Sequence, residues 1–319
     1  MSTSILVGDC RVTLPTLPER SVRCCVTSPP YWGLRDYGHG DQIGLESTPD
    51  AYVAEMVAVF REVRRVLTDD GTLWLNLGDS YSSMRDSKAT PDTLRGDSDG
   101  TAVVGAMNRN PAALRAAGLK HKDLVGIPWR VAFALQADGW YLRSDIIWHK
   151  PNSMPESVTD CPTKAHEYVF LLAKSARYYY DAKAIEEESK TPRNSADGFG
   201  TEGKKSKGIA FLRTQRAGSK HDDVEKTGRN RRTVWTIATS PYKGAHFATM
   251  PPALAEPCIL AGSAKGDTIL DPFGGAGTTG LVADRLGRDA ILCELNPTYA
   301  GLAFHRVAND SPLFSEVIR

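Results

Sequence analysis

The sequence has no long apolar stretch, since no run approaches the roughly 18 apolar residues that a membrane-spanning helix requires. Its start, MSTSILVGDC, also lacks the basic beginning and the long apolar centre of a secretory signal peptide. These absences predict a soluble protein of the cytoplasm that makes no contact with a membrane.

A strong excess of either charge is absent as well. The 39 Lys and Arg residues nearly balance the 38 Asp and Glu residues, which leaves a formal net charge of +1. The chain as a whole is therefore not a polycation. Any contact with nucleic acid must come from local basic patches.

Cysteine is scarce, and its spacing excludes the usual zinc sites. No C-x-x-C pair occurs, and no histidine stands at a companion position of zinc-binding spacing. We therefore expect no metal site and interpret the thiols as reduced and buried, as in cytosolic proteins. The six cysteines are Cys10, Cys24, Cys25, Cys161, Cys258 and Cys293.

The rest of the composition is that of a globular protein, with 319 residues of which 41% are hydrophobic and 24% charged. Apolar runs predict strands over residues 5–7, 22–27, 72–77, 142–148, 167–173, 233–237, 268–270 and 290–293. Helical spacing of apolar residues predicts helices over residues 52–67, 124–138, 253–261 and 278–286. This alternation is typical of an α/β fold, and we expect a Rossmann-like, mostly parallel twisted sheet with helices on both faces.

Residues 27–37, TSPPYWGLRDY, directly follow the apolar run of residues 22–26. Pro29 and Pro30 cannot donate to a sheet ladder, so the strand must end there. The two prolines stiffen the backbone, and we expect them to hold Tyr31 and Trp32 outward. Taken alone, the stretch fits a simple strand-ending turn with surface aromatics equally well.

Residues 268–280, TILDPFGGAGTTG, contain a G-x-G-x-x-G pattern at Gly275, Gly277 and Gly280. The pattern follows a predicted strand and opens a predicted helix, where glycines let a ligand approach the backbone and the helix N-terminus. Glu294 ends the next strand, 19 residues after Gly275, where it can accept hydrogen bonds from ribose hydroxyls. A nucleotide-type site is therefore predicted at these strand ends.

Two features favour S-adenosylmethionine over a nicotinamide cofactor at this site. Asp271 precedes the glycines, where a carboxylate would repel a pyrophosphate but attract a sulfonium or ammonium group. Only 25 residues follow Glu294, which is too few to complete a dinucleotide-binding domain. The missing part of the sheet must then come from the front of the chain, which makes the order of elements circularly permuted.

With Ser28-Pro29-Pro30-Tyr31 first and Phe273-Gly274-Gly275-Ala276-Gly277 last, the chain closely resembles the amino-group DNA methyltransferases of the permuted β type. The resemblance spans nearly the whole chain and implies S-adenosylmethionine as cofactor and N4 of cytosine or N6 of adenine as target. It implies a base site of Ser28, Pro29, Pro30 and Tyr31. It implies a cofactor site of Asp9, Cys10, Met250, Asp271, Phe273, Gly275, Gly277, Thr278, Glu294 and Asn296.

In such an enzyme the target base leaves the duplex, and its amino nitrogen must regain a localised lone pair. The resemblance implies that Ser28 and the Pro29 carbonyl accept the two amino hydrogens while Tyr31 stacks on the base. Direct in-line transfer then needs neither a covalent intermediate nor a metal. Asn76 and Asp79 end a predicted strand and are candidates to line the base pocket, although Asp79 fits a turn cap equally well.

Double-stranded DNA is the implied partner, and residues 203–232 hold ten Lys or Arg against three Asp or Glu. We expect this stretch to contact the DNA backbone, although such a segment is often only a solvated surface. Residues 80–122 are polar, and we expect a mobile loop that closes over DNA or a surface insert instead. The candidate DNA contacts are Trp32, Lys150, Arg213, Arg216, Arg229, Arg231 and Arg232.

The motif order predicts three regions in one methyltransferase fold. Residues 1–182 form a catalytic half, residues 183–232 a target-recognition insertion, and residues 233–319 a cofactor-binding half. A homodimer and a cognate restriction endonuclease are further partners that the resemblance allows.

The sequence leaves alternatives open for the target base and for the class of protein. In the family that the chain resembles, serine at the first motif position is commoner among N4-cytosine enzymes, so Ser28 favours N4 of cytosine, while N6 of adenine stays open. A DNA-binding protein without turnover and a nicotinamide oxidoreductase are rivals of other classes. Pro257-Cys258 matches the nucleophile pair of cytosine-C5 methyltransferases, but it precedes the glycine loop, so we expect Cys258 to be a core residue.

Overall fold

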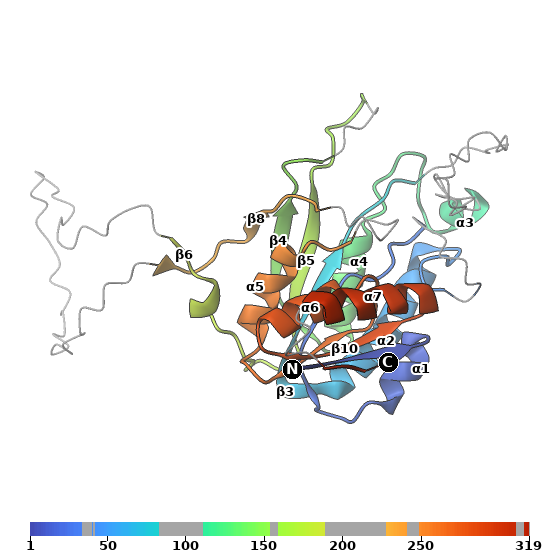
Figure 1. The fold of residues 1–319 in the computed structure, drawn as a ribbon. Helices are drawn as coiled ribbons and strands as arrows, with labels where there is room; N and C mark the ends of the chain where they lie inside the picture. Colours follow the sequence, from blue (N-terminus) through green and yellow to red (C-terminus); the bar gives the residue numbers. More distant parts are fainter. Residues whose placement is uncertain are drawn as a thin grey trace, which may run out of the picture.

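A computed structural model describes residues 1–33, 40, 42–82, 111–153, 159–188, 228–240, 249–310 and 316–318. Within these residues a nine-stranded sheet has the order β11-β1-β10-β9-β2-β3-β5-β4-β8 (Figure 1). Neighbouring strands are parallel except β5, which runs antiparallel to β3 and β4. The strands are β1 (Ser2–Val7), β2 (Val22–Thr27), β3 (Leu67–Leu77), β4 (Tyr141–His149), β5 (His166–Ala173), β8 (Val234–Thr236), β9 (Thr268–Asp271), β10 (Asp289–Glu294) and β11 (Glu316–Ile318).

Helices cover both faces of this sheet, as the sequence predicts. Side chains of α2 and α4 share one core cluster with β2, β3 and β5, whereas α5 and α6 pack into a second cluster on the other face. Helix α7 lies beside α6 and packs on β1 (Figure 1). The helices are α1 (Cys10–Thr13), α2 (Pro49–Val66), α3 (Pro111–Ala116), α4 (Ile127–Ala137), α5 (Pro252–Gly262), α6 (Thr278–Arg285) and α7 (Pro297–Asp310).

Shorter elements complete the described chain. A 3-10 turn, η1 (Leu14–Thr16), follows α1, and a second, η3 (Lys183–Ile185), precedes a small separate sheet of β6 (Glu187–Glu188) and β7 (Gly228–Arg229). None of the described helices has both the length and the apolar character needed to span a bilayer.

The start and the end of the chain meet in the middle of the sheet. Strand β9 lies between β10 and β2, and β10 lies between β9 and β1. The pairing of Cys25 with Leu270 brings the carboxyl end of β2 beside that of β9. The circularly permuted arrangement predicted from the motif order is therefore the observed one.

Helix α2 illustrates how local sequence sets these elements. Thr48 has extended backbone angles and accepts a hydrogen bond from the Ala51 backbone N–H, while Pro49 occupies the first turn, where it loses no internal hydrogen bond. Buried side chains recur at helical spacing, among them Tyr52, Met56 and Phe60. The helix thereby presents one continuous apolar face to the sheet.

The structure corrects the expected boundaries in two places. The sequence Asp69-Asp70-Gly71, between the predicted helix of residues 52–67 and the predicted strand of residues 72–77, lies inside β3, whose register with β2 shifts there. An ion pair between Asp70 and Arg23 of β2 accompanies this irregularity. Helix α7 and strand β11 were not expected at all.

The expectation that residues 80–122 form a mobile polar loop is wrong for the part that the structure describes. Residues 111–116 form α3, and Leu114 and Leu119 are buried in the core beside α4. Two leucines in an otherwise polar stretch are enough to anchor it. Residues 83–110 of the segment lie outside the described residues.

Candidate active site

A buried carboxylate joins the ends of β2 and β9. The Thr27 hydroxyl donates to Asp271 Oδ1 at 2.6 Å, and the Thr279 hydroxyl donates to Asp271 Oδ2 at 2.7 Å. The Phe273 backbone N–H also donates to Oδ1, at 3.0 Å. Asp271 is only 3% exposed, and this burial raises its pKa. The hydrogen bonds from Thr27, Thr279 and Phe273 act to lower the pKa but do not outweigh the burial. The carboxylate expected to face a cationic ligand thus binds groups of the protein itself.

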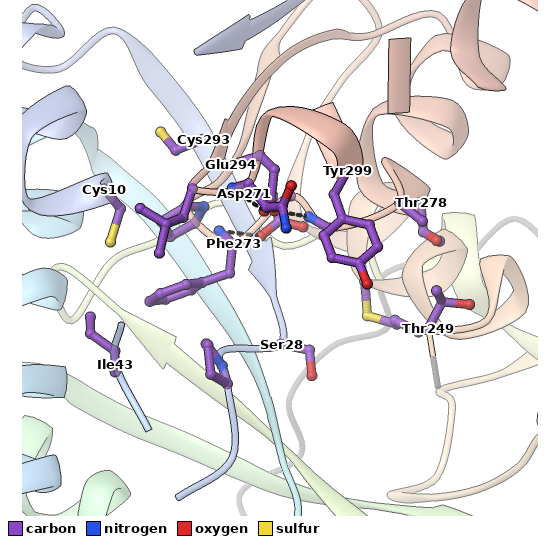
Figure 2. A pocket seen from close by; sticks show the side chains of 18 of the residues that line it. Cys10, Ser28, Ile43, Thr249, Asp271, Phe273, Thr278, Cys293, Glu294 and Tyr299 are labelled. Atoms are coloured by element: carbon purple, nitrogen blue, oxygen red, sulfur yellow. Dashed lines mark hydrogen bonds between the residues drawn. The ribbon is translucent and has the colours of Figure 1, made fainter. Parts of the chain in front are cut away.

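A cavity of about 180 Å³ opens at these strand ends (Figure 2). It is lined by all the residues expected to hold the cofactor except Gly277, and by Ser28 and Pro30 of the base motif. Pro29 and Tyr31 are not among the lining residues. Residues that the sequence did not single out complete the wall, namely Gln42, Ile43, Thr249, Pro272, Gly274, Ala276, Cys293, Leu295 and Tyr299.

The glycine loop adopts a backbone that favours glycine. Gly275 and Gly277 have φ of +51° and +76°, a left-handed region that other residues rarely occupy. A Cβ on Gly277 would lie 2.8 Å from the Ala303 Cβ, so Gly277 allows α7 to pack directly against the loop. Gly277 therefore does not line the cavity but allows α7 to pack against the loop that does.

Glu294 ties this loop to the next turn. One of its carboxylate oxygens accepts the Gly275 backbone N–H at 2.7 Å, and the other accepts the Asn296 N–H at 2.8 Å. Asn296 in turn accepts the Thr298 N–H at the start of α7. Because each carboxylate oxygen can accept more than one hydrogen bond, Glu294 is suited to hold the loop and to receive a ligand hydroxyl.

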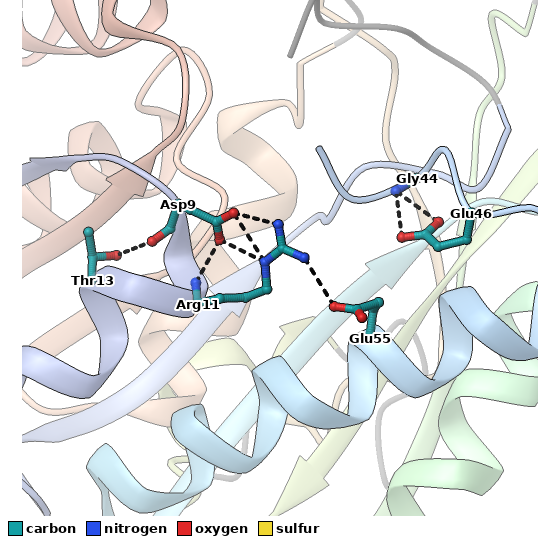
Figure 3. Close-up of polar contacts among 6 residues, drawn as sticks. All are labelled: Asp9, Arg11, Thr13, Gly44, Glu46 and Glu55. Atoms are coloured by element: carbon teal, nitrogen blue, oxygen red, sulfur yellow. Dashed lines mark hydrogen bonds and ion pairs between the residues drawn. The ribbon is translucent and has the colours of Figure 1, made fainter. Parts of the chain in front are cut away.

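Asp9 also lines the cavity and lies at the start of α1 (Figure 3). Its carboxylate accepts the Arg11 backbone N–H at 2.8 Å and pairs with the Arg11 guanidinium at 2.6 Å. Burial acts to raise the pKa of Asp9, but the hydrogen bonds and charge of Arg11 outweigh it and lower the pKa. Arg11 also reaches Glu55 of α2, which fixes its position.

The base motif only partly matches its predicted conformation. Ser28 lines the cavity, and the Tyr52 hydroxyl of α2 donates to the Pro30 carbonyl at 2.8 Å. Tyr31 is half-buried, and its hydroxyl donates inward to Glu167 Oε2 at 2.6 Å. Its predicted stacking on a base stays a prediction.

The prediction that Trp32 points outward and contacts DNA is wrong. Trp32 is 2% exposed, and its indole N–H donates to the Glu46 carbonyl at 2.8 Å. Ile43 belongs to the same apolar cluster. A large apolar ring gains more by burial than by exposure when its N–H finds a partner, as here.

The basic residues proposed to contact DNA fall into three groups. Arg213 and Arg216 lie outside the described residues. Arg229 and Arg232 both donate to Glu187 of the small sheet, while Arg231 lies over the Trp235 ring, 4.8 Å from its centroid. Their contact with DNA stays a prediction.

Lys150 forms an ion pair with Glu167 and lies over the Trp148 ring, 4.3 Å from its centroid. Trp148 itself is 4% exposed and donates its indole N–H to the Ile237 carbonyl, so it belongs to the core. Cys258 is also a core residue, as expected, since it is 1% exposed, does not line the cavity and has a pKa raised by burial.

The donor set of the cavity fits S-adenosylmethionine. In Figure 2 the side chains of Cys10, Ile43 and Phe273 lie on one side, which suits a flat purine ring. The hydroxyl groups of Thr249 and Tyr299 lie on the other side, with a polar character that suits an amino-acid moiety. The glycine loop leaves the backbone open to a ligand between them.

Comparisons with known proteins find a matching family and similar proteins. A family model described as DNA methylase, for enzymes acting on N6 or N4 amino groups, matches residues 22–305. The type II methyltransferase M.SmaI of Serratia marcescens is 48% identical over 306 residues, covering 96% of this chain and 91% of the relative. M.Cfr9I of Citrobacter freundii, also a type II methyltransferase, is 47% identical over 313 residues, covering 96% and 88%.

A solved structure resembles the whole chain. The protein TTHA0409 of Thermus thermophilus, described as a DNA modification methylase and crystallised with S-adenosyl-L-methionine, superposes with a TM-score of 0.60. It is 26% identical, and the match covers 99% of this chain and 98% of that chain.

Proposed function

Because the chain belongs to the DNA methylases that modify the N6 amino group of adenine or the N4 amino group of cytosine, we propose that its own target is N4 of cytosine. The family membership makes it an S-adenosylmethionine-dependent DNA methyltransferase. The finer assignment to cytosine rests on Ser28 at the first position of the base motif.

One observation supports the proposal above the others. Ser28 lines the same cavity as Asp9, Phe273 and Glu294, although these residues come from opposite ends of the chain. A base amine placed at Ser28 would therefore meet the cofactor within one enclosed space. Holding two reactants in a fixed geometry is the main source of acceleration in a direct transfer.

The residues of the base motif have distinct tasks in this proposal. The lone pair of a cytosine amino group is delocalised into the ring, so the nitrogen is a poor nucleophile. Ser28 Oγ and the Pro29 carbonyl accept the two amino hydrogens, which favours a tetrahedral nitrogen whose lone pair points into the cavity. S-adenosylmethionine, when bound, supplies the electrophilic methyl group.

Tyr31 supports the base from the neighbouring position. Stacking of an extruded base on an aromatic ring contributes roughly 1–3 kcal/mol in single-strand binding proteins. The base must first leave the duplex, which costs a few kcal/mol of pairing and stacking. Stacking on Tyr31 offsets part of that cost in this mechanism.

The resemblance to type II methyltransferases supports a role in a restriction–modification system.

Nucleoside mass spectrometry tests the proposal directly. Purified enzyme is incubated with S-adenosylmethionine and plasmid DNA from a host without DNA methyltransferases, and the DNA is then digested to nucleosides. N4-methylcytosine is expected, and a Ser28→Ala variant should form it much more slowly. N6-methyladenine as the sole product would refute the assignment to cytosine.

A further inference from the structure

A largely buried polar cluster lies beside the base motif, and none of its members lines the cofactor cavity. We call Asn76, Lys150 and Glu167 the Glu167 cluster. The Asn76 side-chain NH2 lies 3.2 Å from Ser28 Oγ, 2.7 Å from the Tyr31 hydroxyl oxygen and 3.0 Å from Glu167 Oε2. The antiparallel pairing of β3 with β5 brings these residues together, because Asn76 is paired with Val169, close to Glu167.

Glu167 determines which way the Asn76 amide points. An ionised carboxylate only accepts hydrogen bonds, so Asn76 must turn its NH2 group, not its carbonyl, toward Glu167 Oε2. Asn76 Oδ1 is buried and has no hydrogen-bond partner within the described part of the chain. The orientation of the Asn76 amide is therefore maintained by the contacts of its NH2 group and not by its carbonyl.

The same orientation fixes what Ser28 offers to a substrate. Because Asn76 presents N–H to Ser28 Oγ, the serine oxygen accepts one hydrogen bond from the protein and does not donate to Asn76. A flipped amide would present its carbonyl to Ser28 and draw the serine proton toward it. The remaining lone pair of Ser28 would then lose its direction toward a base amine.

Tyr31 is held by the same carboxylate. Its hydroxyl donates to Glu167 Oε2 at 2.6 Å, and burial, followed by the charge of Glu167, raises the pKa of Tyr31, so the hydroxyl keeps its proton. The ring lies against Gly78, where a Cβ would come within 2.5 Å of the Tyr31 ring. The tyrosine is thus immobilised before any base arrives.

Lys150 makes the charge of Glu167 tolerable in this environment. The side chains of the pair are only 19% and 16% exposed, and burying a charge is costly unless an opposite charge pairs with it. The Lys150 ammonium also lies over the Trp148 ring, which limits its movement. Lys150 thereby holds the Glu167 carboxylate in place beside Asn76 and Tyr31.

We infer that Glu167 is a positioning residue for methyl transfer, acting through Asn76 and Tyr31 to aim Ser28 Oγ at the target amine. The inference rests on the proposed role of Ser28 and adds a residue that touches neither cofactor nor base. Glu167 does not line the cavity, so it should affect the transfer rate without affecting cofactor binding.

A Glu167→Gln variant tests this inference, because glutamine keeps the shape but can donate as well as accept. Single-turnover transfer is measured from tritiated S-adenosylmethionine to plasmid DNA from a host without methyltransferases, beside the cofactor Kd and the thermal midpoint. We expect the rate to fall at least tenfold, with the Kd changed less than twofold. Glu62→Gln, whose glutamate pairs with Arg65 on α2, is the matched control and should leave all three values unchanged.

A second background separates positioning from general damage. If Glu167 acts through Ser28, then adding Glu167→Gln to a Ser28→Ala enzyme should lower its residual rate less than twofold. A wild-type rate in Glu167→Gln, or an undiminished loss in the Ser28→Ala background, would overturn the inference. If Glu167→Gln lowers the thermal midpoint, the transfer rate is measured instead in a Tyr31→Phe variant, which removes the hydroxyl that donates to Glu167. A wild-type rate in Tyr31→Phe would also overturn the inference. Lack of transfer by the unmodified enzyme would instead count against the proposed function.

Discussion

A Thr27→Val variant tests the hydrogen bond between Thr27, just before the base motif, and Asp271 at the end of β9. Valine has nearly the same shape as threonine, so the variant removes the hydroxyl without leaving a cavity. Asp271 would then keep two of its three donors, the Thr279 hydroxyl and the Phe273 backbone N–H. Because Thr27 directly precedes Ser28, the variant would lose a side-chain hydrogen bond that ties the base motif to the end of β9.

The expected cost follows from the charge and burial of the acceptor. A hydrogen bond to an ionised group contributes about 1.5–3 kcal/mol, and a buried carboxylate that loses a donor cannot replace it with water. Asp271 is 3% exposed, so solvent does not compensate. We expect Thr27→Val to lower the free energy of unfolding by about 1.5–3 kcal/mol at neutral pH.

The pH dependence supplies an independent check with a defined sign. Burial raises the pKa of Asp271 in the fold above its value of 3.8, so its contribution to stability is fully present below that value and is lost as pH rises through the folded pKa. Thr27 acts to lower this pKa, and its removal raises the pKa further. The variant should therefore differ most from the unmodified protein at neutral pH and least in acid.

Chemical denaturation at pH 7.5 and pH 5 measures both effects. Thr3→Val is the matched control, because Thr3 is 1% exposed and its hydroxyl has no hydrogen-bond partner among the residues described here. Removing an unsatisfied buried hydroxyl should be neutral or stabilising. Equal losses for the two variants, or a Thr27→Val loss that grows toward acid, would refute the role assigned to Asp271.

Three further predictions concern the cofactor loop and the DNA contacts. Gly277→Ala should abolish measurable cofactor binding, because the left-handed backbone costs about 1–2 kcal/mol with a side chain and the new Cβ would meet Ala303 at 2.8 Å. Glu294→Gln should raise the Kd for S-adenosylmethionine about tenfold, since only one amide oxygen remains to accept a backbone N–H such as that of Gly275. Arg232→Ala should weaken DNA binding and lower the slope of log affinity against log salt by about one, because its side chain is 69% exposed.

Controls for these variants come from the same elements. Gly301 lies in α7 with open space around it, so Gly301→Ala should add about 0.5–1 kcal/mol of stability and leave cofactor binding intact. Cofactor binding by Gly277→Ala at the normal affinity would contradict the close packing of α7 on the loop. An unchanged salt slope in Arg232→Ala would place that arginine outside the DNA contact.

The sequence predicts the sheet well because its strands are local apolar runs that end at strong turn residues. The permuted order also follows from local information, since Ser28 and Gly275 lie in recognisable motifs whose sequence order fixes the topology. Helix α7 was not predicted, because the 25 residues after Glu294 were judged only as too few for another half of the domain. In the structure 14 of these residues form a helix.

The misjudged side chains depend on distant partners. Trp32 is buried in one core cluster with Ile43, and its N–H donates to the Glu46 carbonyl of the following loop. Glu167 stands at the start of an ordinary apolar strand and becomes a neighbour of Asn76 only through the β3–β5 pairing. Local patterns carry no trace of either contact.

The acidic residues of the site show where prediction from motifs is incomplete. A carboxylate at a strand end is expected to bind a ligand, yet Asp9, Asp271 and Glu294 all accept hydrogen bonds from backbone N–H groups or side chains next to the cavity. These bonds join groups of the protein alone, so the order of the loops that shape the cavity does not require the ligand. Cofactor affinity is then not reduced by an ordering cost. Weakening one of these bonds should disorder the loop and reduce cofactor binding together, which amide hydrogen exchange at Gly275 would reveal.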